Sequence, residues 1–96
     1  MQTAFYIVFN LKTVRGFESF ARFFVGDNQE FAYQLFDKLK GISVGVNDSV
    51  LQMDLMETRE GLPVNIQVMG CTLEELAENC KTITKEVFKF FTLHQF

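Results

Sequence analysis

The feature that most constrains the fold of this 96-residue chain is one pattern that occurs twice. Each occurrence has two runs of alternating residues around a turn, then a glycine, a capping residue and apolar residues at helical spacing. The glycines at the turns and before the helices are Gly16, Gly26, Gly61 and Gly70. We therefore expect one domain over 1–96 that contains a hairpin-helix repeat, with one copy in 3–41 and the other in 50–92.

The run from Phe17 to Val25 fits two kinds of secondary structure. As a strand, its odd and even positions face opposite sides, whereas as a helix Phe17, Phe20, Ala21 and Phe24 share one face. No Ser, Thr, Asp or Asn residue caps such a helix at its start. The parallel with the second half of the chain favours a strand.

The first helix is expected from Asn28 to Lys40. Asp27 followed three residues later by Glu30 resembles a capping box, and Gly41 offers a left-handed stop. After it, 41–49 is predicted to be a connection or a short edge strand. The apolar positions of that strand are Ile42, Val44 and Val46, and a turn at Asn47 and Asp48 follows them.

The second helix has the clearer start, because Thr72 and Glu75 occupy the positions of a capping box. Apolar residues then recur at steps of three and four as far as Phe91. The predicted fold class is α+β with the order ββαββα. It comprises a four-stranded, mainly antiparallel sheet with both helices packed on one face.

Charge and composition limit the functional class. With nine basic and twelve acidic residues the net charge is −3, which argues against general nucleic-acid binding. No apolar run reaches the roughly 20 residues of a membrane helix, and two cysteines without a signal peptide suggest a reducing compartment. We therefore expect a cytoplasmic protein that binds neither membrane nor nucleic acid.

Residues suited to catalysis or metal binding are few. His94 is the only histidine and lies near the end of the chain, and Cys71 and Cys80 have no metal-ligand spacing. Cys71 beside a helix start could be a reactive thiol, but an inert half-buried cysteine is the stronger interpretation. We expect no catalytic residue, no metal site and no cofactor, which favours a non-enzymatic domain.

The unusual part of the sequence is the sheet face that the helices would leave uncovered. Regular alternation places Phe5, Ile7, Phe9, Ala21, Phe23, Met53, Leu55, Val64, Ile66 and Val68 toward the helices. The opposite face then mixes large apolar residues with Asn10, Arg22, Gln52, Asp54, Asn65 and Gln67. A solvated face is normally polar, so contiguous apolar surface on it indicates an interface. The candidate interface or ligand-binding residues are Tyr6, Val8, Phe20, Arg22, Phe24, Met56, Asn65, Gln67 and Met69.

Two functions fit this face. The first is self-association, with a homodimer that buries the open face, or contact with another protein. The alternative is a small-molecule binding protein or enzyme with a pocket where subunits meet, which would hold an apolar ligand. A pure interface should be flat and dry, whereas a ligand site needs a cavity with both apolar and polar walls.

Overall fold

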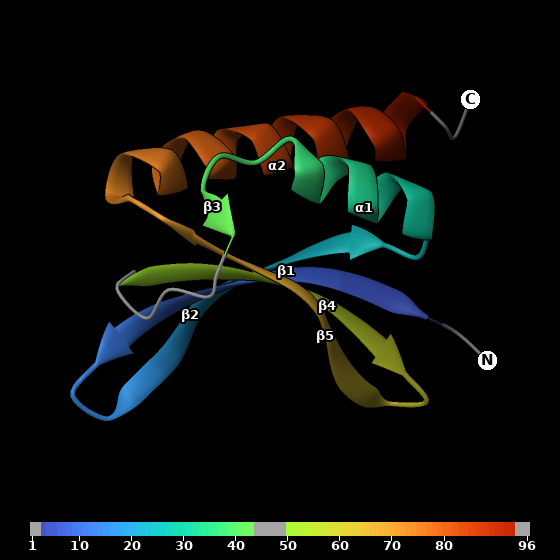
Figure 1. Ribbon diagram of the computed structural model, residues 1–96. Coiled ribbons are helices and arrows are strands. Elements are labelled where there is room, and N and C mark those ends of the chain that lie inside the picture. The colour runs from blue at the N-terminus through green and yellow to red at the C-terminus, as the bar shows by residue number, and fades with distance from the viewer. Residues whose placement is uncertain (1–2, 44–49, 94–96) are drawn as a thin grey trace.

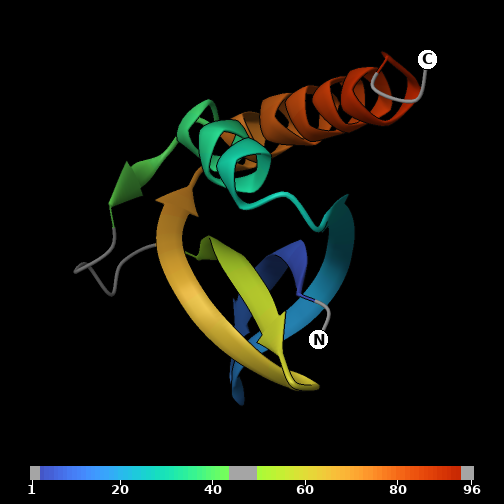
Figure 2. The same cartoon turned by 90° about the vertical axis from the view of Figure 1, so that its right-hand side faces the viewer.

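Two layers, a sheet and a pair of helices, make up the computed structural model, which describes residues 3–43 and 50–93. Both helices lie on the same side of the sheet (Figures 1 and 2). In chain order the elements are β1 (Ala4–Thr13), β2 (Gly16–Gly26), α1 (Gln29–Asp37), β3 (Ile42–Ser43), β4 (Leu51–Arg59), β5 (Leu62–Cys71) and α2 (Leu73–Leu93). The predicted α+β class is confirmed, and so is the order ββαββα for the four long strands and two helices that the structure describes, to which the two-residue β3 adds a fifth strand at the sheet edge.

The sheet order is β2-β1-β4-β5-β3, and every neighbouring pair is antiparallel. The two hairpins meet at β1 and β4, so the join between the two halves of the chain runs through the middle of the sheet. The run 17–25 is extended, as predicted. Ile42 begins the short edge strand β3, whereas Val44, Val46 and the expected turn at Asn47 and Asp48 lie outside the described residues.

The start of α2 has the hydrogen bonds of a capping box. The Thr72 backbone N–H donates to Glu75 Oε1 at 2.9 Å, and the Glu75 N–H donates to Thr72 Oγ1 at 3.1 Å. Each side chain thus satisfies a donor that has no partner within the helix. The predicted helix start is confirmed.

The ends of α1 differ from the prediction. The capping residue is Asn28, not Asp27, because Asn28 Oδ1 accepts the Phe31 N–H at 2.8 Å. The helix ends at Asp37, three residues before the expected Lys40, and Gly41 has no positive φ. Gly41 is instead a point of close approach, since a Cβ there would collide with the Gly70 carbonyl and lie 2.8 Å from the Met69 side chain.

The core lies between the sheet and the helices. β1 and β4 contribute alternate residues that are fully buried, as their patterns predict. The buried apolar residues are Phe5, Ile7, Phe9, Val25, Ala32, Leu35, Phe36, Leu39, Leu51, Met53, Leu55, Cys71 and Ile83. This packing holds one face of the two central strands against the helices and leaves their other face open.

Three irregularities in register bend the sheet. On β2 the extra residues are Phe20 and Val25, and on β5 the extra residue is Ile66. Such bulges increase local twist and bend the strand that carries them. Both hairpin ends curve away from the helices in Figure 1, so the uncovered face is concave along the strands.

The bulge on β5 also reverses the direction of the residues that follow it. Met69 pairs with the buried Met53 and packs against the core, whereas Val68 pairs with Asp54 on the uncovered face. Gln67 pairs with the buried Leu55, so it too leaves the uncovered face, although it remains exposed. The predicted orientation of these three residues is wrong because strict alternation fails at a bulge.

Candidate functional site

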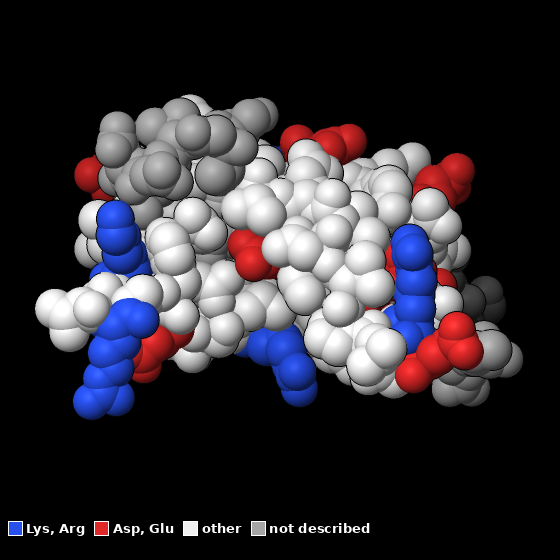
Figure 3. All heavy atoms as spheres, turned by 60° about the horizontal axis from the view of Figure 1, so that its bottom comes forward, with Lys and Arg blue, Asp and Glu red and all other residues white. Residues whose placement is uncertain are grey.

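The uncovered face contains a hollow of about 580 Å³. Its walls come from all four long strands, and its lining residues are Tyr6, Val8, Asn10, Ser19, Phe20, Ala21, Arg22, Asp54, Met56, Thr58 and Pro63. Figure 3 shows this side of the molecule, where uncharged atoms occupy most of the middle and most charged side chains lie toward the margins. The volume of the hollow falls within the range of about 300–1,000 Å³ that is typical of small-molecule sites.

Rows of cross-strand partners centred on β1 position the lining. Directly opposite residues in antiparallel strands share a face and lie close together. Given from β2 through β1 to β4, the rows are Phe24, Tyr6 and Met56; Arg22, Val8 and Asp54; and Ser19, Asn10 and Gln52. The apolar row therefore lies beside a row in which a cation and an anion flank a valine.

Aromatic rings form one wall of the hollow. Tyr6 and Phe24 have ring centroids 5.5 Å apart, and the Arg22 guanidinium carbon lies 4.8 Å from the centroid of the Tyr6 ring. Phe20, the bulged residue of β2, is 51% exposed, and its ring lies 6.3 Å from that of the buried Phe9. Phe20 therefore lines the hollow at the bulge, while the adjacent Ala21 also packs against the core.

A buried amide on β1 is fixed by a serine on β2. The Ser19 hydroxyl donates to Asn10 Oδ1 at 2.6 Å, and Asn10 is only 9% exposed. Because its oxygen accepts this bond, the Asn10 amide nitrogen remains free to donate toward the carboxylate of the neighbouring Asp54, and this donation partly offsets the rise that burial causes in the pKa of Asp54.

Asp54 is the least satisfied polar group of the hollow. Its Oδ2 accepts a hydrogen bond from Asn65 Nδ2 at 3.3 Å, but Oδ1 is buried and has no bond of ordinary geometry from the described residues. Burial raises the pKa of Asp54, and the side-chain amides of Asn10 and Asn65 partly oppose that rise. An acid with a raised pKa is ionised at a cost to the folded state.

We expect Asp54→Asn to stabilise the fold near pH 7, because the burial that raises the pKa of Asp54 makes its charged form costly in the folded state. The raised folded-state pKa means that ionising Asp54 lowers stability as pH rises through that pKa. Below the unfolded-state pKa the aspartate is protonated in both states, so the gain should vanish near pH 3. Urea unfolding at both pH values measures this, with the exposed Asp37→Asn as control. A gain that is equal at the two pH values would contradict it.

The structure brings together most of the residues chosen from sequence. Tyr6, Val8, Phe20, Arg22 and Met56 line the hollow. Phe24 lies against the Tyr6 ring, and Asn65 bonds to Asp54. Gln67 and Met69 do not belong to this face, as the register of β5 shows.

Several lining residues were not among those predicted, of which Asp54 is the most important. Alternation in the sequence assigns Asp54 to this face but does not single it out, although it is a carboxylate between Met53 and Leu55 on a central strand. A charged residue in the middle of a sheet is the signal that could have identified it. Ser19, Thr58 and Pro63 lack such a signal because they are ordinary residues near strand ends or bulges.

The cysteines have little thiolate character. Burial is the main cause that raises the pKa of Cys71 to about 11, and it raises the pKa of Cys80 as well. Within 3–43 and 50–93 no three His, Cys, Asp or Glu side chains are placed to hold a metal ion. His94 lies outside the described residues.

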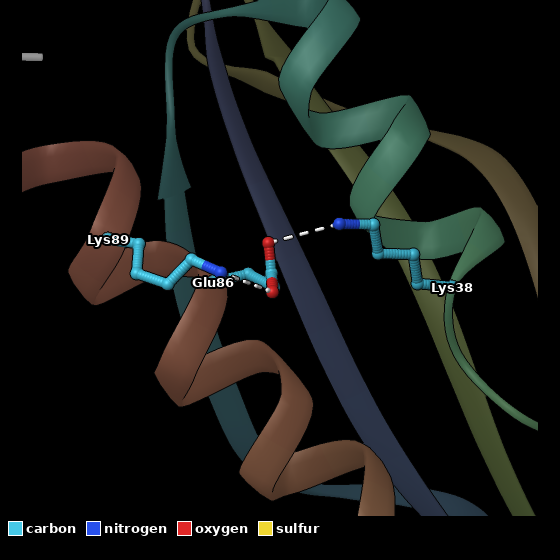
Figure 4. Close-up of polar contacts among 3 residues, drawn as sticks. All are labelled: Lys38, Glu86 and Lys89. Carbon is cyan, nitrogen blue, oxygen red and sulfur yellow. Dashed lines mark hydrogen bonds and ion pairs between the residues drawn. The ribbon is translucent and has the colours of Figure 1, made fainter. Parts of the chain in front are cut away.

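Ion pairs outside the hollow join the two helices (Figure 4). Glu86 on α2 accepts from Lys38 Nζ at 3.1 Å and from Lys89 Nζ at 3.5 Å, and the hydrogen bond from Lys38 lowers the pKa of Glu86. Beside them the Phe31 and Phe90 rings stack with centroids 4.0 Å apart. Lys38 and Lys89 share the single carboxylate of Glu86, and the Lys38 pair and the stacked rings connect α1 and its C-cap to α2, so this region is a weaker candidate site.

Comparisons with protein-family models, curated proteins and solved structures found no match to this chain. The part of the chain that the structure describes contains no helix with both the length and the apolar character to cross a bilayer.

Proposed function

We propose that this chain is a binding protein whose concave, uncovered sheet face takes up a small and largely apolar molecule. The observation that carries the proposal is the hollow of about 580 Å³ with aromatic walls and a half-buried carboxylate that has one buried oxygen without a hydrogen bond of ordinary geometry from the described residues. Apolar walls supply affinity, and a few fixed polar groups orient the ligand.

The shape of the face favours a ligand over a flat protein interface. Interfaces between proteins are usually well packed and exclude unpaired charge from their centres. Here Asp54 lies near the middle of the sheet, and the bulges leave the surface concave. A small molecule can fill such a surface without matching its curvature over a large area.

The uncharged dye Nile red tests the proposal, because its fluorescence rises in apolar surroundings. We expect saturable binding of one dye per chain, and Val8→Trp should weaken it at least tenfold by filling the centre of the hollow. The matched control is Val14→Trp, since Val14 is fully exposed in the β1–β2 turn. Absence of saturable binding, or equal binding by the two variants, would refute the proposal.

Self-association through the same face is a second candidate, supported by a different observation. Arg22 and Asp54 flank Val8 from opposite sides, and Phe20 and Phe24 are about half-exposed. If two copies face each other across a two-fold axis that runs parallel to β1 between their sheets, Arg22 of each copy lies over Asp54 of the other. A single monomeric mass in sedimentation measurements at micromolar concentration would exclude this candidate.

A further inference from the structure

We propose that the ligand of the hollow is an organic ammonium ion with an aromatic or branched apolar body, held by Asp54. This inference rests on the proposed function and adds the chemical class of the ligand. It follows from the charge that the hollow leaves uncompensated and from the surfaces around that charge.

Asp54 has no cationic partner among the described residues. The ion pairs found among 3–43 and 50–93 involve Glu57 and Glu86, and none involves Asp54. Among the described residues, Asn65 gives Asp54 a hydrogen bond that is long at 3.3 Å, and the Asn10 amide also acts on the carboxylate, but neither amide carries a positive charge. Oδ1 is covered by the protein itself, so a ligand in the hollow would reach Asp54 at Oδ2, whose bond from Asn65 is long enough to leave room for a second donor.

Arg22 is the cation nearest to Asp54 in the register of the sheet. Val8 separates the two residues across the strands, and the Arg22 guanidinium lies over the Tyr6 ring. Arg22 is exposed at the rim, where water compensates its charge. Among the described residues of the hollow, the charged group without a compensating partner is therefore Asp54. A ligand that carries a carboxylate or phosphate would be repelled by it, so a cationic ligand fits the hollow better.

The residues around Asp54 suit an organic cation better than a metal ion. A metal site needs several ligating side chains, and the described residues hold no group of three around Asp54. One carboxylate suits an ammonium group, which has three donors and needs no fixed coordination geometry. The rings of Tyr6 and Phe20 and the side chain of Met56 then cover an apolar body attached to it.

Three compounds that share one phenyl body provide the test: 2-phenylethylamine, 2-phenylethanol and 3-phenylpropionate. Chemical-shift titration of the isotope-labelled chain reports the affinity and the site of each compound. We expect the amine to bind at least tenfold more tightly than the alcohol and the carboxylate, with shifts at Val8, Asp54 and Met56. Asp54→Asn should reduce the amine to the affinity of the alcohol, whereas Asp37→Asn, on the exposed end of α1, should leave the preference intact.

The outcomes separate this inference from the proposed function. Equal or tighter binding of the alcohol or the carboxylate, or an amine preference that survives Asp54→Asn, overturns the ammonium assignment. If Nile red still binds and Val8→Trp still blocks it, the hollow remains a ligand site of another chemical class. If none of the three compounds binds and the dye does not bind either, both proposals fail.

Discussion

Asn79→Ala is expected to lower the free energy of unfolding by about 3 kcal/mol, because it removes a buried polar bridge between distant segments. Asn79 on α2 is 1% exposed. Its Oδ1 accepts the Lys40 N–H at 2.8 Å, and its Nδ2 donates to the Lys40 carbonyl at 2.9 Å. The same Nδ2 also lies 3.2 Å from Met53 Sδ. The substitution leaves both backbone groups of Lys40 without these partners and opens a cavity beside the core.

Urea unfolding followed by circular dichroism measures this loss. The control is Glu78→Ala, one position earlier on α2, where the side chain is exposed and a change within about 0.5 kcal/mol is expected. A loss below 1 kcal/mol for Asn79→Ala would show that water replaces the bridge. The connection between α1 and β3 would then not depend on this side chain.

Phe9→Ala should cost about 4 kcal/mol, since removal of a fully buried ring leaves a cavity that the sheet cannot close. Phe9 has no exposed surface, and its ring lies 5.5 Å from that of Phe23 and 6.3 Å from that of Phe20. Because Phe20 also lines the hollow, the substitution should weaken Nile red binding in the protein that remains folded.

Phe88→Ala is the matched control, because Phe88 is 65% exposed on α2 and the same atoms are removed. Its unfolding free energy should change by less than about 0.5 kcal/mol. Equal losses for the two variants, measured by the same urea titration, would contradict the placement of Phe9 in the core.

The parts of the fold that follow local rules could be predicted from sequence. Alternation in β1 and β4 gave the correct buried residues because no bulge interrupts the residues of either strand. The capping box at Thr72 depends only on neighbours in the chain, so it too was predictable. The end of α1 was not, because Gly41 is needed for the close approach of β5, which is a tertiary contact.

The site was predictable in its location and only partly in its chemistry. The bulge at Ile66 has no marker in the sequence, and it moved Gln67 and Met69 off the uncovered face. Asp54 gains its importance from burial and from a missing hydrogen-bond donor, which depend on strands far apart in the chain. Periodicity identifies the face of a residue, but it does not report how well that residue is solvated.

The join between β1 and β4 has a consequence for dissecting the protein into pieces. Val8 belongs to the first hairpin and Asp54 to the second, and they become neighbours only where these strands pair. A peptide that carries either hairpin with its own helix would hold only part of the lining of the hollow, however well it folded. Recognition should therefore return only when both fragments are mixed and reassemble, which makes ligand binding a direct reporter of complementation.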